Sequence, residues 1–138
     1  MEYSGWVAVS YHQYQLRDDL AQPPDIPHQG ELINDEADEG SLGIRAFQHT
    51  GRIKLTVRIL AAPPSAPALQ HRRHAEAVLV SESGELYVCE WGSGPVEGFP
   101  NLAADGPGSY RIRVQAPANA PEDAEDEEHQ IEIWLESA

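Results

Sequence analysis

The sequence predicts an all-β protein: an antiparallel two-sheet β-sandwich of seven or eight strands, with acidic loops. Three observations lead to this fold class. Apolar and polar residues alternate with a period of two wherever the chain shows a pattern, turn signals separate the alternating segments, and no long amphipathic helix is evident. A chain of 138 residues can form one domain with its own core, so we expect a single domain over residues 1–138.

Three segments alternate cleanly and are predicted to be strands. Their apolar faces consist of Ile53, Leu55, Val57 and Ile59; of Tyr110, Ile112, Val114 and Ala116; and of Ile131, Ile133 and Leu135. Four less regular segments are also interpreted as strands, at residues 7–16, 43–48, 75–82 and 85–91. Because each strand has one polar face, two sheets packed face to face would bury the apolar faces together.

The connecting segments agree with this arrangement. Ser83-Gly84 and Thr50-Gly51 are typical of tight turns between strands. The three prolines of residues 63–67 cannot take part in a strand ladder, which predicts a loop there. A short helical turn is compatible with residues 31–38, where Gly30 and Gly40 would confine it.

The formal net charge is −14, and the acidic residues are concentrated in two stretches. Residues 18–39 contain eight of the 23 acidic residues and residues 122–128 contain six, with no Lys or Arg in either stretch. This charge argues against nucleic acid or an anionic membrane as a direct partner, because both would be repelled. It favours a basic protein or a metal cation. A compositional bias, visible in the single lysine, is the alternative explanation of the acidity.

Cysteine content and hydropathy indicate the cellular compartment of the protein. Cys89 is the only cysteine, so no intrachain disulfide can form and a reducing compartment is expected. Its place inside an alternating segment favours a buried, inert thiol over a nucleophile. The N-terminus has no secretory signal, and no run of 18 apolar residues could span a membrane. We therefore expect a cytoplasmic protein.

Catalytic and metal-binding patterns are not recognisable, so we expect no enzyme, no cofactor and no metal site. There is no nucleophile-elbow motif, and arginines separate His71 from His74. His12, His49 and His129 could meet only through the fold. Calcium binding by loop carboxylates is the alternative kept open, in which Asp18, Asp19 and Asp25 would meet Asp35 and Asp38 or the acidic run 122–128, although the spacing of a calcium-binding loop is missing.

The most distinctive short motif is Ser10-Tyr11-His12-Gln13-Tyr14. On one strand, Ser10, His12 and Tyr14 would line one face, and Tyr11 and Gln13 the other. Polar aromatic residues on both faces are unusual for a core strand. They either satisfy polar groups at the edge of the sandwich or contact a partner.

This motif and its surroundings resemble the competence protein J family, bacterial inhibitors of a DNA-entry nuclease. That family carries a Ser-Tyr-His-Gln-aromatic element near its N-terminus, matched here by residues 10–14. An acidic stretch ending in Gly40, a Gly-x-Tyr-x-Ile segment at residues 108–112, an acidic loop and a final apolar strand follow in the same order. The acidic run 122–128 and the proline-rich residues 63–67 depart from the family pattern.

The resemblance implies a non-catalytic binding module, an inhibitor or immunity-like partner of a basic bacterial enzyme such as a nuclease. Electrostatic attraction to that partner is expected from Asp35, Glu36, Asp38, Glu39, Glu122, Asp123, Glu125, Asp126, Glu127 and Glu128. Tyr11, His12 and Tyr14 are the motif residues expected to contact it, with Trp134 as an exposed aromatic anchor on the outer face of the last strand. A calcium-dependent binding sandwich and a structural or accessory protein without a ligand remain the alternatives.

Overall fold

A computed structural model describes residues 1–27, 29–34, 37–65, 72–120 and 127–137. Within these ranges the secondary structure consists of eight strands and one 3-10 turn, Ala37–Glu39, with no α-helix. The strands are β1 (Glu2–Ser10), β2 (Gln13–Asp18), β3 (Ser41–Arg45), β4 (Thr50–Ile59), β5 (Arg72–Ser81), β6 (Leu86–Glu90), β7 (Gly108–Pro117) and β8 (Glu128–Ser137). The prediction of an all-β fold is confirmed.

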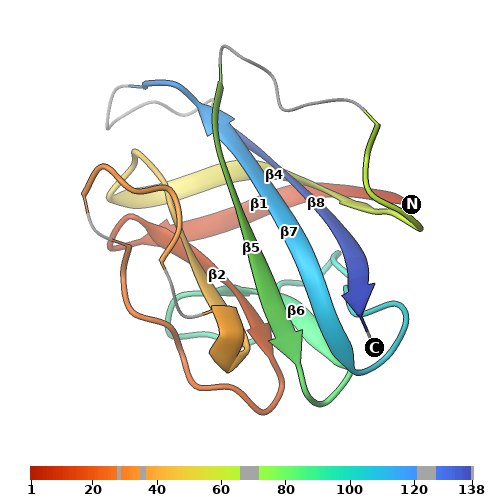
Figure 1. The fold of residues 1–138 in the computed structure, drawn as a ribbon. Helices are drawn as coiled ribbons and strands as arrows, with labels where there is room; N and C mark the ends of the chain where they lie inside the picture. Colours follow the sequence, from red (N-terminus) through yellow and green to blue (C-terminus); the bar gives the residue numbers. More distant parts are fainter. Residues whose placement is uncertain (28, 35–36, 66–71, 121–126, 138) are drawn as a thin grey trace.

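The strands form one continuous, strongly curved sheet, which corrects the expectation of a two-sheet antiparallel sandwich. The order is β3-β2-β1-β4-β8-β7-β5, and β6 pairs with the free side of β2. Figure 1 shows β5, β7 and β8 side by side, with β1 and β4 continuing the sheet behind them. The sheet nearly closes on itself, so the molecule is barrel-like. The pairing of β4 with β8 is parallel, whereas the other strand pairs are antiparallel.

The sheet bends at the connection between β1 and β2. The sequence predicts a single strand over residues 7–16, but the chain turns at Tyr11 and His12, and β1 and β2 share only the pair Ser10–Gln13. Beyond that pair β1 continues along β4, while β2 continues between β3 and β6. One short hairpin therefore joins the two halves of the curved sheet.

The apolar faces of the strands meet inside the curved sheet and form one core. All three cleanly alternating segments lie where their pattern predicts, with Ile53, Leu55, Val57, Ile112, Val114, Ile131 and Ile133 among the core residues. Phe99, Leu102 and Ala103 cover one end of this core from the segment between β6 and β7.

The middle of the outer face of β8 is buried too, which corrects the expectation that Trp134 is exposed. Trp134 is 6 % exposed and Glu132, on the same face, 2 %. Arg111 on β7 is the register partner of Trp134, and the long apolar stem of an arginine can cover an aromatic ring. Trp134 is therefore not an accessible anchor.

Two smaller findings complete the description of the fold. Cys89 is buried on β6, and burial raises the pKa of its thiol, as expected for an unreactive cysteine. Among the described residues, no helix has the length and apolar character needed to cross a membrane.

Candidate functional site

The turn between β1 and β2 holds two consecutive residues in a strained backbone conformation. Tyr11 has a φ of 54° and His12 a φ of 64°, in the left-handed region that residues other than glycine rarely adopt. A two-residue hairpin needs positive φ at both central positions, and Asn or Gly usually fills them. Such strain costs on the order of 1–3 kcal/mol per residue and persists only where the surrounding structure enforces it.

The loop between β3 and β4 enforces this conformation. The backbone N–H of His12 donates to the carbonyl of His49 at 3.0 Å, and the N–H of Ala46 donates to the carbonyl of His12 at 2.7 Å. The His12 ring nitrogen Nδ1 lies 3.2 Å from the Ala46 carbonyl oxygen. These contacts hold the turn rigidly against the loop.

The clamped turn presents a group of rings, which we call the aromatic tip (Tyr11, His12, His49 and Trp91). The Tyr11 ring lies 4.8 Å from the Trp91 ring and 5.5 Å from the His49 ring, and the His12 and His49 rings are 5.0 Å apart. Tyr11 is 50 % exposed and Trp91 43 %. The tip is thus an exposed aromatic surface. Tyr11 and His12 come from the turn, and His49 and Trp91 come from two other segments that pack beside it.

The positions of these four residues in the sequence do not predict that their rings lie together. His49 and Trp91 lie 38 and 80 residues after Tyr11 in the sequence, and only the fold brings them together. Tyr11 and His12, two residues of the motif at positions 10–14, belong to this tip.

Tyr14, the third motif residue, lies inside the molecule. It is fully buried, and its hydroxyl lies 2.7 Å from Nδ1 of His129. Nε2 of His129 lies 2.7 Å from Oε2 of Glu127, and the Glu127 carboxylate accepts hydrogen bonds from the backbone N–H groups of Phe47 and Gln48 at 3.1 and 3.3 Å. The prediction that Tyr14 contacts a partner is therefore corrected: its hydroxyl joins a buried hydrogen-bond chain.

The pKa values determine the proton positions in this chain. Burial lowers the pKa of His129, even though Glu127 acts to raise it, so the imidazole is neutral. Burial acts to raise the pKa of Glu127, but the hydrogen bonds from His129 and the backbone outweigh it and the pKa is lowered. Burial and the charge of Glu127 raise the pKa of Tyr14 well above its ordinary value. Nε2–H of His129 therefore donates to the carboxylate, and Tyr14 O–H donates to Nδ1.

The predicted steering carboxylates fall into three groups. Glu39 and Glu128 are exposed, as expected, whereas Glu127 is buried in the hydrogen-bond chain, so its assignment as a surface charge is corrected. The side chain of Asp38 lies outside the described part of the structure. So do Asp35, Glu36, Glu122, Asp123, Glu125 and Asp126.

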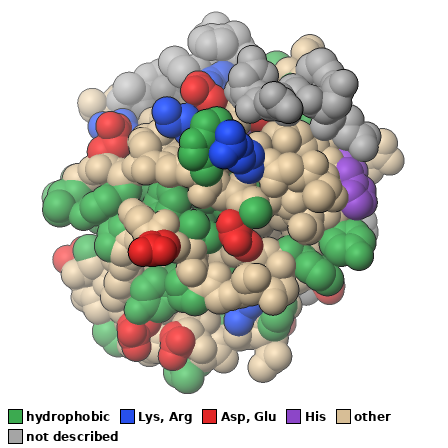
Figure 2. All heavy atoms as spheres, turned by 180° about the vertical axis from the view of Figure 1, so that it is seen from behind, with side chains coloured by type: hydrophobic (Ala, Val, Ile, Leu, Met, Phe, Trp, Pro, Cys, Tyr) green, Lys and Arg blue, Asp and Glu red, His purple; other side chains and the backbone are tan. Residues whose placement is uncertain are grey.

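One pocket is lined by described residues from within the first acidic stretch and from just before the second. Gln29 and Gly30 of the first stretch and Ala120, two residues before the second, line the same pocket. In the view from behind, the Asp and Glu side chains are scattered among hydrophobic and uncharged ones (Figure 2).

Calcium binding finds no support in the described residues. They contain no group of three or more His, Cys, Asp or Glu side chains arranged to hold a metal ion. Asp18, one of the expected ligands, is buried and accepts hydrogen bonds from Ser83 Oγ at 2.8 Å and from the backbone N–H of Leu20 at 3.0 Å. It ties the end of β2 to the β5–β6 turn.

The fold and the site together define a small, barrel-like β domain with a rigid, exposed aromatic surface. No protein-family model and no curated protein sequence matches the chain. Two solved structures share its fold. The crystal structure of ComJ from Bacillus subtilis, described as an inhibitor of the DNA-degrading activity of NucA, matches over 96 % of this chain and 94 % of its own, with a TM-score of 0.62 and 13 % sequence identity. The protein described as crocagin biosynthetic gene J matches over 99 % of this chain and 97 % of its own, with a TM-score of 0.59 and 14 % identity.

The chain therefore has a ComJ-like fold along its whole length, as the resemblance to the competence protein J family implies. At this level of identity the likeness concerns the fold alone.

Proposed function

We propose that this protein is a protein-binding module that inhibits a basic bacterial enzyme such as a nuclease, or serves as its immunity-like partner. The aromatic tip is the contact surface in this proposal. The observation that carries it is the exposed Tyr11–Trp91 pair, in which Tyr11 lies on the strained turn within the family motif. The ComJ-like fold supports it, because ComJ is described as a nuclease inhibitor.

The tip has the physical properties of a binding anchor. Tyrosine and tryptophan are enriched among the interface residues that contribute most to affinity. Strain concentrates at functional sites, where the conformation is held for a purpose other than stability. Because the hydrogen bonds to Ala46 and His49 already order the turn, little conformational entropy remains to be lost on binding.

The acidic residues contribute to the approach of the partner. Asp19, Asp25, Glu31, Glu39 and Glu128 are exposed. A nuclease that binds DNA carries a positive groove, and a field of opposite sign speeds the encounter with it. Surface charges of this kind change the association rate more than the final affinity.

The test is DNA degradation by a nuclease of the NucA type, measured with increasing concentrations of this protein. The wild-type protein should inhibit, and Tyr11→Ala or Trp91→Ala should raise the inhibition constant roughly 10-fold or more, as expected for anchors at an interface. Trp6→Ala is the matched control, because Trp6 is 45 % exposed on β1 but contacts Arg52 instead of the tip. Equal effects of the Trp6 and Trp91 variants would contradict the assignment of the tip, and a wild-type protein without inhibition would contradict the function.

The acidic run is tested in the same system by stopped-flow association. A variant in which Glu122, Asp123, Glu125, Asp126 and Glu128 are replaced by their amides should associate more slowly, by roughly 10-fold at low salt, with an unchanged dissociation rate. Glu127 is left intact because it is buried and structural. An association rate that is unchanged by these replacements and by added salt would leave the run with a solubility role only.

A further inference from the structure

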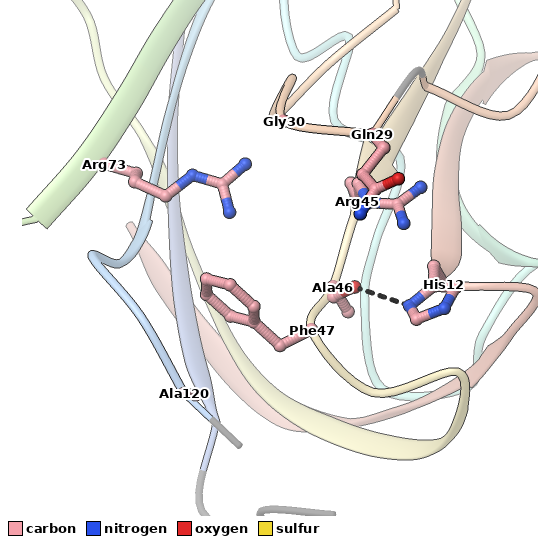
Figure 3. A pocket seen from close by; sticks show the side chains of 8 residues that line it. All are labelled: His12, Gln29, Gly30, Arg45, Ala46, Phe47, Arg73 and Ala120. Carbon is pink, nitrogen blue, oxygen red and sulfur yellow. Dashed lines mark hydrogen bonds between the residues drawn. The ribbon is translucent and has the colours of Figure 1, made fainter. Parts of the chain in front are cut away.

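A pocket of about 410 Å³ lies beside the aromatic tip, between the β1–β2 turn, the end of β3 and the beginning of β5. Its walls include His12, Gln29, Arg45, Phe47 and Arg73. Figure 3 shows Arg73 extending into it from β5 and Arg45 lying on the opposite side, with the Phe47 ring below them. In a protein with a net charge of −14, two guanidinium groups thus face one concave space.

Neither arginine is neutralised by a carboxylate among the residues that the structure describes. Arg45 donates from Nη1 to the carbonyl oxygen of Pro27 at 3.1 Å, and no acidic side chain of the described ranges forms an ion pair with it or with Arg73. The ionised Glu127 is the nearby charge that acts on Arg73, but its oxygens already accept from His129 and the backbone. Among the described residues, the positive charge of the pocket therefore has no carboxylate partner.

Arg73 is positioned but incompletely satisfied. Its guanidinium carbon lies 5.1 Å from the centre of the Phe47 ring, a cation–π contact that orients the group. Its Nη2 atom is shielded from solvent and donates no hydrogen bond to any described group. A shielded donor without an acceptor is costly, and most such groups in proteins are satisfied by a ligand, a solvent molecule or another side chain.

Burial lowers the pKa of Arg73, because it disfavours the charged guanidinium, and the nearby positive charge of Arg45 lowers it further. The negative charge of a bound anion would offset both effects, because it favours the charged guanidinium. A guanidinium presents parallel N–H groups that match the oxygens of phosphate and carboxylate groups, and a pair of them can bind one such group from two sides.

We propose that this pocket binds a small ligand through a phosphate or carboxylate group, with Arg73 and Arg45 as its binding residues. The pocket volume lies in the range typical of small-molecule sites. The pocket shares His12 with the aromatic tip, but its binding residues Arg73 and Arg45 are not part of the tip, so the proposal does not depend on the inhibitory function.

The net negative charge of the protein does not prevent this binding. At physiological ionic strength, charges separated by more than about 8 Å are largely screened. A bound oxyanion would lie about 2.8 Å from each guanidinium nitrogen that contacts it. Carboxylates beyond that distance are therefore screened, whereas the two guanidinium groups contact the oxyanion directly.

The test uses the full chain and three sodium salts, phosphate, succinate and chloride, compared at equal ionic strength in thermal melting and calorimetry. Phosphate, succinate or both should raise the melting temperature by roughly 4 °C at about tenfold the dissociation constant, and chloride should not. The two oxyanion arms distinguish a phosphate-bearing from a carboxylate-bearing ligand. An equal rise with chloride, or no rise with either oxyanion, would overturn the proposal.

Variants locate the site. Arg73→Gln and Arg45→Gln should each raise the dissociation constant of the oxyanion at least about tenfold, because each removes a charged donor. Arg52→Gln is the matched control, since Arg52 is an exposed arginine that contacts Trp6. Because the readout is the shift caused by the oxyanion within each variant, a lower starting stability does not affect it.

Nuclear magnetic resonance gives an independent readout of the position. Addition of the oxyanion should shift the backbone amide signals of Ala46 and Phe47 in the wild-type protein, and the shifts should be lost in Arg73→Gln. Shifts confined to other parts of the chain, or binding that survives both pocket substitutions, would exclude this pocket as the site.

Discussion

Tyr14, His129 and Glu127 show how a single side chain from an acidic run becomes part of the core. The chain of hydrogen bonds connects β2, β8 and the loop between β3 and β4. It contains one negative charge, on Glu127, and every donor in it faces an acceptor. A fully satisfied network of this kind stabilises one arrangement of the three segments, because any other arrangement would leave a buried polar group unpaired.

Tyr14→Phe tests this network at the scale of one atom. The substitution removes the hydroxyl that donates to His129 and leaves Nδ1 buried without a donor, so the free energy of unfolding should fall by about 1–3 kcal/mol. Urea denaturation at neutral pH measures it. Tyr3→Phe is the control, because the Tyr3 hydroxyl makes only a 3.6 Å contact with the sulfur of Met1, and a change of no more than about 0.5 kcal/mol is expected. Equal losses in both variants would show that the chain contributes nothing specific.

At the scale of elements, Glu132 connects three strands on the outer face of the sheet. Its Oε2 lies 3.0 Å from Nη1 of Arg58 on β4, and its Oε1 accepts from Nε of Arg113 on β7 at 2.7 Å. These contacts join the parallel pair β4–β8 to the antiparallel pair β7–β8. The carboxylate is almost completely buried, so the two arginines compensate the cost of burying its negative charge.

Glu132→Gln and Glu136→Gln compare a buried with an exposed ion pair on the same strand. Arg113 is buried and would lose its charged partner in Glu132→Gln, so we expect a loss of roughly 3–5 kcal/mol in the free energy of unfolding. Glu136 pairs with Arg111 at 2.9 Å at the surface, where both side chains are more than one third exposed, and its substitution should cost less than about 1 kcal/mol. Chemical denaturation of both variants gives the difference. A Glu132 variant as stable as the Glu136 variant would show that the buried pair adds no net stability.

For the whole molecule, three buried groups make the fold sensitive to acid. The pKa of His129 is lowered, chiefly by burial, so the folded protein resists protonation of this ring. Burial acts to raise the pKa values of Glu127 and Asp18, but hydrogen bonds to both carboxylates prevail and lower them. In each case the unfolded chain binds the proton more tightly than the folded protein does. The stability contributed by each group is therefore present above its ordinary pKa and is lost as the pH falls below it.

The expected result is a decline in unfolding free energy with decreasing pH in two stages. The first begins below the ordinary histidine pKa of 6.5 and belongs to His129; the second begins below 4.5 and belongs to Glu127, with Asp18 following below 3.8. In His129→Gln the first stage should be smaller by up to about 1.4 kcal/mol per pH unit, since glutamine does not titrate there. Denaturant titrations of the wild-type protein and the variant between pH 7 and pH 3 measure both stages. Parallel profiles would show that His129 is not the group responsible.

Local pattern was sufficient for the three regularly alternating strands, but it missed the turn at residues 11–12 and the assembly of the sheet. The segments at residues 53–59, 110–116 and 131–135 alternate strictly, and each lies within a strand that buries the expected face. An alternating pattern indicates that one face of a strand is buried, but it does not indicate what covers that face. It therefore could not distinguish two separate sheets from one curved sheet. Nor could it predict that β4 and β8 pair in parallel.

The candidate site divides in the same way. The motif at residues 10–14 contains the turn, yet Tyr11 and His12 carry no turn signal, because contacts with residues 46 and 49 impose their positive φ. Composition alone established the excess of negative charge and the absence of a disulfide. Contacts between segments distant in the sequence decide which carboxylates are buried and which aromatic rings are exposed. They also decide which arginines share a pocket. Burial and pairing are properties of what surrounds a side chain, and only the folded chain supplies those surroundings.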